Sequence, residues 1–176
     1  MPKRMDNALP NSRYHTVKAI KPTTIINRDC RNTTGMNIEE IKKIISEKPN
    51  LADAVGMEFV STPDEDTCVA TMHVDERNCQ PMGLLSGGAS LALAEYLAGI
   101  GSSALCPDQA CVGVNVSGSH VRSAYVGDTV TATAHIVHKG RTLHVWNVNI
   151  TDSSGATLST VSVMNFIIEK PKETGK

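Results

Sequence analysis

The fold is decided by the stretch Gly83-Leu-Leu-Ser86-Gly87-Gly88-Ala-Ser-Leu-Ala-Leu-Ala-Glu95-Tyr-Leu-Ala-Gly-Ile-Gly101. It belongs to a run of thirty residues, between Arg77 and Asp108, that holds one formal charge, Glu95. A helix that is apolar on nearly all sides is a buried helix. Its many alanines and glycines allow a sheet to approach closely. The stretch therefore predicts a long central helix over about residues 86–105, wrapped by a curved antiparallel sheet.

Glu95 is open to more than one interpretation. Burying a charge costs several kcal/mol unless the charge is paired, so the carboxylate is either kept for its chemistry or exposed on a partly solvated helix face. A third interpretation is a membrane span, because residues 82–106 exceed the roughly 20 residues that a bilayer needs. Five glycines, four serines and Glu95 count against that span, since the acid alone costs about 3 kcal/mol on insertion.

Apolar residues recur with the spacing of helices or of strands over much of the rest of the chain. A short helix is expected after Asn37, with Ile38, Ile41, Ile44 and Ile45 on one face. Strands are expected at 57–61, 67–74, 110–119, 128–138, 142–151 and 156–168. No crossover helices separate the later strands, so the pattern predicts an α+β fold in which an antiparallel meander follows the central helix.

Length and charge limit the organisation of the chain. Its 176 residues favour one domain, which we expect at residues 36–170, with a disordered tail at 171–176. Residues 1–35 hold seven Lys/Arg and two Asp/Glu, whereas residues 36–176 have a net charge of −6. We expect the first 35 residues to be a disordered or non-native leader, or else a targeting or partner-binding arm. The acidic body predicts no nucleic-acid partner.

The cysteines and histidines give no metal signature. The five cysteines form no CxxC pair and no His/Cys cluster with zinc spacing. We expect reduced thiols that fill the core, with no metal and no separate cofactor. His73, His135 and His144 fall within strand patterns and are expected to be structural. No apolar signal segment follows Lys3-Arg4, so we expect a cytoplasmic protein without a membrane partner.

The start of the central helix offers hydrogen-bond donors. Ser86 suits the N-cap, and Gly87 and Gly88 leave first-turn amides open to a ligand, where a polarised carbonyl would be stabilised. The alternative is a plain helix cap. Glu95 follows Gly87 by eight residues, about 12 Å along the axis, which is too far for both to act on one carbonyl within one chain. The spacing favours a site shared by two copies of the helix across a two-fold axis.

Cationic and imidazole groups gather at strand ends farther along the chain. Arg122, Lys139 and Arg141 accompany His120 and His138 beside glycine-containing turns. Clustered cations in an acidic domain suit a phosphate-bearing ligand. The alternative is ordinary hairpin turns with solvated charges.

Three motifs in order resemble the hotdog-fold acyl-CoA thioesterases. They are Gln80–Glu95, Ser119–Ala124 and Gly140–Trp146. The most similar group is the 4-hydroxybenzoyl-CoA and 1,4-dihydroxy-2-naphthoyl-CoA thioesterases with their phenylacetate-pathway relatives, and the resemblance covers about residues 37–169. It implies a hotdog fold, a homodimer or homotetramer, and hydrolysis of an aryl- or medium-chain acyl-CoA, in which coenzyme A is part of the substrate.

The resemblance also implies residue roles. Glu95 would be the catalytic carboxylate, as nucleophile or as general base, and it would come from the protomer opposite Gly87, whose N–H would polarise the thioester carbonyl. Gln80 would orient the thioester or the water, and Ser86 would stand beside Gly87. The coenzyme A moiety would be held by Gly113, Val114, Asn115, Val116, His120, Val121, Arg122, Ser123, His138, Lys139, Gly140, Arg141 and Thr142.

Two positions depart from that family's pattern. The family usually has His where this chain has Ser86, and often Ser or Thr where this chain has Gly99. Two other functions therefore stand beside thioester hydrolysis. One is a non-catalytic protein that binds acyl-CoA or an aromatic ligand. The other is a hotdog dehydratase or hydratase, which is disfavoured because no histidine lies between His73 and His120.

Overall fold

The structure is a computed structural model, and it describes residues 36–170. The expected leader at 1–35 and tail at 171–176 lie outside the described residues. The elements, in chain order, are α1 (Glu39–Ser46), α2 (Leu51–Val55), β1 (Met57–Val60), β2 (Thr67–His73), α3 (Gly87–Leu105), β3 (Gln109–His120), β4 (Thr129–Lys139), β5 (Leu143–Thr151) and β6 (Thr157–Glu169).

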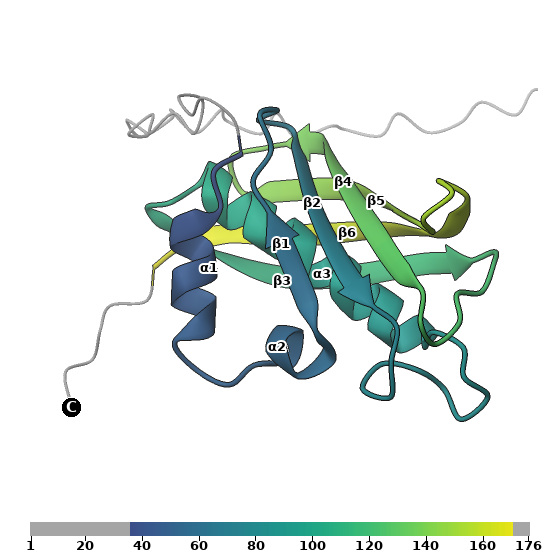
Figure 1. Ribbon diagram of the computed structural model, residues 1–176. Coiled ribbons are helices and arrows are strands. Elements are labelled where there is room, and N and C mark those ends of the chain that lie inside the picture. Colours follow the sequence, from purple (N-terminus) through teal and green to yellow (C-terminus); the bar gives the residue numbers. More distant parts are fainter. Residues whose placement is uncertain (1–35, 171–176) are drawn as a thin grey trace, which may run out of the picture.

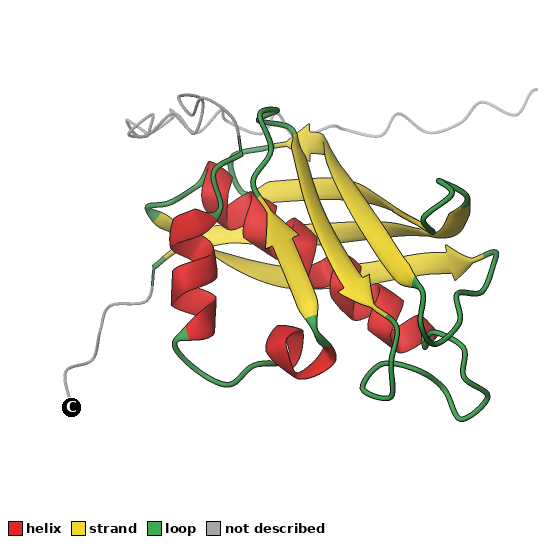
Figure 2. Cartoon of the chain, in the orientation of Figure 1, coloured by secondary structure: helices red, strands yellow, loops and turns green. Residues whose placement is uncertain are grey.

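One curved sheet surrounds the long helix α3 (Figure 1). Its strands follow the order β1-β2-β4-β5-β6-β3, and each neighbouring pair is antiparallel. Helices α1 and α2 lie beside β1 (Figure 2). The predicted α+β architecture, a central helix wrapped by an antiparallel sheet, is confirmed.

The prediction of a four-strand meander is wrong for β3. Strands β4, β5 and β6 do form a meander, but β3 pairs with β6 at the far edge, and β4 pairs with β2. The segment between β3 and β4 causes this placement. Its Ala124 carbonyl accepts from the Leu85 N–H, and its Gly127 N–H donates to the Val74 carbonyl, both at 2.9 Å. The chain thus passes beside the start of α3 and reaches the end of β2, and β4 begins next to that end of β2.

The core lies between α3 and the concave face of the sheet. Its inward residues alternate along each strand, as the period-two pattern requires; they include Ala70, Met72, Val130, Ala132, Ala134, Val148, Ile150, Val161 and Val163. Trp146 is fully buried and packs directly on Gly101, where an added Cβ would stand 2.7 Å from the indole. The glycine explains how so large a ring fits under a helix. Cys68 and Cys106 are buried in the same core.

The first helices were predicted less completely. Helix α1 packs on the core through Ile41 and Ile45, but Ile44, expected on the same face, is 63% exposed. Helix α2 was not predicted, because five residues are too few to establish a helical period. The Asn50 side chain caps α2 by accepting from the Asp53 N–H (3.1 Å). Gly56 ends it with φ of 76°, a left-handed conformation that favours glycine.

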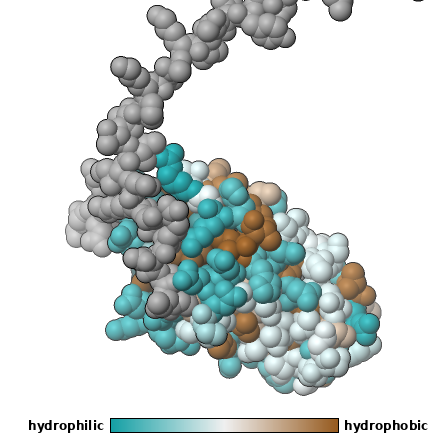
Figure 3. Space-filling model, turned by 90° about the horizontal axis from the view of Figure 1, so that it is seen from above, coloured by the Kyte–Doolittle hydropathy of each residue, from teal (hydrophilic) through white to brown (hydrophobic). Residues whose placement is uncertain are grey.

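The surface is a mosaic of hydrophilic and hydrophobic residues (Figure 3). Large apolar side chains are exposed mainly at the β3–β6 edge and in the loops; at that edge they are Val112, Val114, Met164, Phe166 and Ile168. Among the described residues, no helix is both long and apolar enough to span a membrane.

Candidate active site

The loop before α3 is held by Asn78. Its side-chain amide donates to the carbonyls of His73 (2.8 Å) and Val55 (3.1 Å), and its backbone carbonyl accepts from the Ser86 N–H (2.9 Å). Gln80 lies on the same loop, and its Nε2 donates to the Leu85 carbonyl at 3.4 Å. This predicted site residue therefore folds back toward the start of the helix.

Helix α3 begins with open hydrogen-bond donors. Ser86 is the N-cap, as predicted, but its side chain makes no capping hydrogen bond. The amides of the first turn have no acceptor within a helix, and the helix dipole adds partial positive charge there. Gly87 and Gly88 bear no side chains that would cover them, so the helix start retains the donors that a polarised carbonyl needs.

A histidine from another element reaches this helix start. His120 ends β3, and its Nε2 lies 2.7 Å from the position that a Cβ on Gly87 would occupy. Its Nδ1 shares a hydrogen bond with the hydroxyl of buried Ser159 on β6 (2.8 Å). The fold thus brings together Gln80, Ser86, Gly87 and His120 at one end of β3.

Glu95 lies at the other end of β3. Its Oε1 is 2.8 Å from the position of a Cβ on Gly113, so only glycine at 113 leaves room for the carboxylate in this position. A β-bulge interrupts the β3–β6 pairing between Gly113 and Asn115. The Glu95 side chain is exposed in the single chain, because this face of α3 meets the sheet's open edge and not its centre.

A buried polar cluster lies two turns beyond Glu95 on α3. The hydroxyl of Ser102 contacts Nε1 of Trp146 (2.8 Å), Nδ1 of His144 (3.1 Å) and Nδ2 of Asn165 (3.1 Å). Burial, followed by the charges of Lys139 and His138, lowers the pKa of His144 to about 4. His144 is therefore structural, as predicted. Ser102 and Asn165 had no signal in the sequence, because serine and asparagine are common in strands and helices without function.

The predicted cations do not form one cluster. The turn His138–Thr142 lies near the Gly113 end of β3, because Leu143 and Val112 both pair with Phe166. Arg122 follows His120 at the opposite end. Seven residues of strand separate Gly113 from His120, about 23 Å. In one chain, the residues expected to hold coenzyme A are divided between these two ends.

The predicted site residues thus form two half-sites. The first, here called the helix-start half-site, contains Gln80, Ser86, Gly87, His120, Val121, Arg122 and Ser123. The second, called the carboxylate half-site, contains Glu95, Gly113, Val114, Asn115, Val116, His138, Lys139, Gly140, Arg141 and Thr142. Neither half-site holds both the carboxylate and the carbonyl-binding donors.

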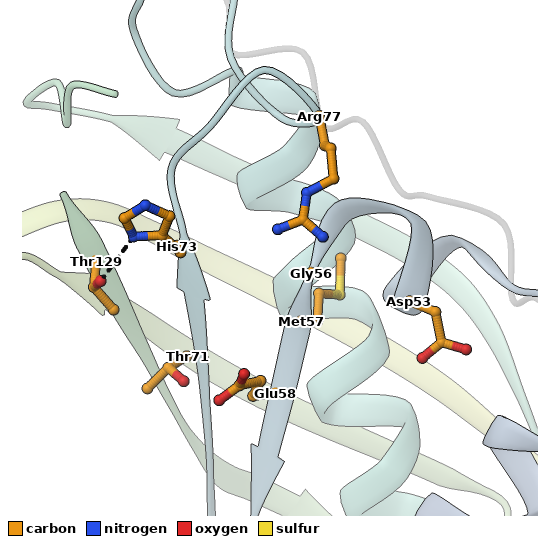
Figure 4. Close-up of a pocket in the computed structure, with 8 residues that line it drawn as sticks. All are labelled: Asp53, Gly56, Met57, Glu58, Thr71, His73, Arg77 and Thr129. Carbon is orange, nitrogen blue, oxygen red and sulfur yellow. Dashed lines mark hydrogen bonds between the residues drawn. The ribbon is translucent and has the colours of Figure 1, made fainter. Parts of the chain in front are cut away.

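A separate pocket lies at the opposite edge of the sheet (Figure 4). It is lined by Asp53, Gly56, Met57, Glu58, Thr71, His73, Arg77 and Thr129. None of these is a predicted site residue, and β1 and β3 form opposite edges of the sheet. His73 shares a hydrogen bond with the Thr129 hydroxyl (3.3 Å). Within residues 36–170, no group of three or more His, Cys, Asp or Glu could hold a metal ion.

Comparisons with known proteins decide the family. The profile described as "Thioesterase superfamily" matches residues 82–159, which include helix α3 and strands β3, β4 and β5. The 1,4-dihydroxy-2-naphthoyl-CoA hydrolase of Listeria monocytogenes is 37% identical over 124 residues, covering 70% of this chain and 98% of the relative. The chain belongs to the thioesterase superfamily.

Two further similarities agree with this assignment. The proofreading thioesterase of Cronobacter turicensis is 40% identical over 106 residues, which cover 60% of this chain and 76% of the relative. The crystal structure of a mutant thioesterase from Pseudomonas aeruginosa has a TM-score of 0.70 at 31% identity, covering 78% of this chain and 99% of the other. The predicted hotdog fold and the predicted enzyme class, an acyl-CoA thioesterase, are thereby confirmed.

Proposed function

We propose that this thioesterase hydrolyses an aryl- or medium-chain acyl-CoA to the free acid and coenzyme A, in active sites shared by two copies of the chain. The observation that carries the proposal is the separation of the two half-sites along β3. One half-site supplies donors for the thioester carbonyl, and the other supplies the Glu95 carboxylate. Hydrolysis needs both on the same thioester group.

An antiparallel pairing of β3 with β3 of a second copy supports this arrangement. β3 is a twelve-residue edge strand, and unpaired edges readily recruit another strand. Val112 and Val114 on it are 45% and 46% exposed. A two-fold axis between Val116 and Ser117 would set Gly113 of each copy opposite His120 of the other. Each Glu95 would then face a helix-start half-site on the neighbouring chain.

Within such a site, the helix start would stabilise the transition state. The thioester carbonyl gains negative charge when it is attacked, and the Gly87 N–H at the positive end of the α3 dipole would receive it. Glu95 would activate water as a general base or attack as the nucleophile. Gln80 would orient the thioester or the water. No metal is required for these steps.

The charged residues of both half-sites would hold the nucleotide part of coenzyme A. Arg122 belongs to the helix-start half-site, and Lys139 and Arg141 belong to the carboxylate half-site. Among the described residues, none of the three forms a salt bridge with a carboxylate. Their guanidinium and ammonium groups are therefore available for phosphates. A dimer of dimers and a cytoplasmic location are further parts of the proposal, to be tested by sedimentation and by cell fractionation.

A hydrolysis panel tests the proposed function. Purified protein is given benzoyl-, naphthoyl- and medium-chain acyl-CoA esters, and free thiol is detected with dithionitrobenzoate. We expect turnover of at least one ester, abolished in Glu95→Gln, while the esters still raise the melting temperature of that variant. Binding of the esters without hydrolysis of any would support a non-catalytic binding protein instead.

A further inference from the structure

His120 occupies an unusual position for a residue expected to hold coenzyme A. It closes β3 and leans on the first residue of α3: a Cβ at Gly87 would stand 2.7 Å from Nε2 and 3.0 Å from Cδ2. The ring therefore lies beside the amides at the helix start, which are the donors proposed for the thioester carbonyl. It lies at the reacting end of the substrate, and the exposed side chain is open to a ligand.

The imidazole is also held in orientation. Its Nδ1 shares a 2.8 Å hydrogen bond with the hydroxyl of Ser159, a residue that is 2% exposed. When Ser159 donates to Nδ1, the ring proton resides on Nε2. That tautomer directs an N–H donor from the nitrogen next to Gly87. The hydrogen bond that one ring nitrogen makes sets the role of the other.

The neighbouring residue leaves this role unfilled. Ser86, the residue before Gly87, makes no capping hydrogen bond. Its hydroxyl is 3.6 Å from the position of a Cβ on Gly88, so it lies beside the first turn of the helix. A hydroxyl on a one-carbon side chain does not extend as far from the helix as an imidazole. The only imidazole at this helix start, among the described residues, comes from β3.

We propose that His120 is a catalytic residue that donates its Nε2–H to the thioester carbonyl oxygen, replacing the imidazole that position 86 lacks. Together with the Gly87 amide, it forms a two-donor site for the oxyanion. Ser159 is its positioning residue. The role involves hydrogen bonding alone, so no proton or bond is transferred to His120. The inference rests on the proposed function, because it assumes that the carbonyl binds at the start of α3.

The role predicts a loss in turnover and not in coenzyme A binding. Removing one oxyanion donor lowers kcat by about a hundred- to a thousandfold. We expect His120→Ala to lower kcat within that range, with KM changed less than threefold. Free coenzyme A has no thioester carbonyl, so its inhibition constant should stay within about twofold of the wild-type value. A residue that only held coenzyme A would instead raise KM and that inhibition constant together.

The decisive experiment places an imidazole back at position 86. We would measure kcat, KM and inhibition by free coenzyme A for wild type, His120→Ala, Ser159→Ala and the double variant Ser86→His/His120→Ala. The double variant is expected to recover at least tenfold in kcat over His120→Ala, and Ser159→Ala is expected to lose less than His120→Ala. His73→Ala is the matched control, because it removes another exposed strand-end histidine bonded to a hydroxyl (Figure 4).

The outcomes separate this inference from the function it rests on. If Glu95→Gln is inactive but His120→Ala keeps its kcat, or loses only affinity for coenzyme A, the inference is wrong and the proposed function stands. If Glu95→Gln is fully active, the proposed site itself fails. Thermal unfolding of each variant identifies any that fold poorly. If His120→Ala folds poorly, Ser159→Ala provides the test instead, because it deletes a single oxygen. An unchanged kcat in Ser159→Ala would overturn the positioning role.

Discussion

The Glu95 carboxylate lies against the backbone of Gly113, with Oε1 2.8 Å from where a Cβ on that glycine would be. The contact joins the one charged residue of the central helix to the bulge in the edge strand. It places the proposed catalytic group at the rim of the sheet, where a second chain can reach it.

Gly113→Ala should therefore damage catalysis more than stability. The added methyl group would meet the far end of a flexible side chain, which can move away at little cost. The carboxylate, however, would be displaced from its position, and misplacement by about 1 Å costs on the order of a hundredfold in rate. We expect kcat to fall tenfold or more, with a melting temperature close to that of wild type. A normal kcat would show that Gly113 does not position Glu95.

Alanine substitutions at two glycines of α3 should change the stability of the fold in opposite directions. At Gly99 no atom lies within 4 Å of an added Cβ, whereas at Gly101 the methyl group would stand 2.7 Å from Trp146 and 2.9 Å from the Cys68 thiol. Gly99→Ala should stabilise the fold by about 0.5–1 kcal/mol through helix propensity. Gly101→Ala should destabilise it by about 1–3 kcal/mol through overpacking. Urea unfolding measures both, and equal shifts would contradict the packing described here.

His144 should make stability depend on pH. Burial lowers its pKa from the usual 6.5 to about 4, so the unfolded chain binds its proton first. The free energy of unfolding should be unaffected by this group above pH 6.5 and should fall as the pH drops from 6.5 toward 4. His144→Asn is expected to flatten the slope in that window, although it weakens the fold at every pH. His73→Gln, at an exposed site, is the matched control for the loss of a histidine side chain.

Much of the architecture was predictable from local patterns. The small-residue run that ends at Gly101 identified a buried central helix, and alternating Val, Thr and Ile placed every strand within about two residues. The position of β3 was not predictable, because it depends on hydrogen bonds such as Leu85 to Ala124 that join distant segments. Strand order is a tertiary property that a period of two does not encode.

The candidate site divides in the same way. The spacing of Gly87 and Glu95 along one helix already favoured a site shared by two chains, and the structure adds where each half lies on β3. What the sequence could not show is proximity across elements. Neither the approach of His120 to Gly87 nor that of Glu95 to Gly113 follows from any motif, because each joins residues from different strands and helices.

Subunit complementation tests the shared site most directly. Glu95→Gln removes the carboxylate half-site, and Gly87→Ala blocks the helix-start half-site by driving a methyl group into His120. Each variant alone should be nearly inactive. When the two chains are differently tagged and co-expressed, random pairing should restore about a quarter of wild-type activity, because each mixed dimer contains one intact site.

The matched control combines two substitutions in the same half-site, Glu95→Gln in one chain and Gly113→Ala in the other. Both sites of that mixed dimer should be damaged. Its activity should be no higher than that of Gly113→Ala chains alone. The account predicts that the purified mixed dimer of Glu95→Gln and Gly87→Ala chains has about half of wild-type activity, because one of its two sites is intact. Activity at the level of the single variants in that purified dimer would contradict it, since each chain would then carry a complete site of its own.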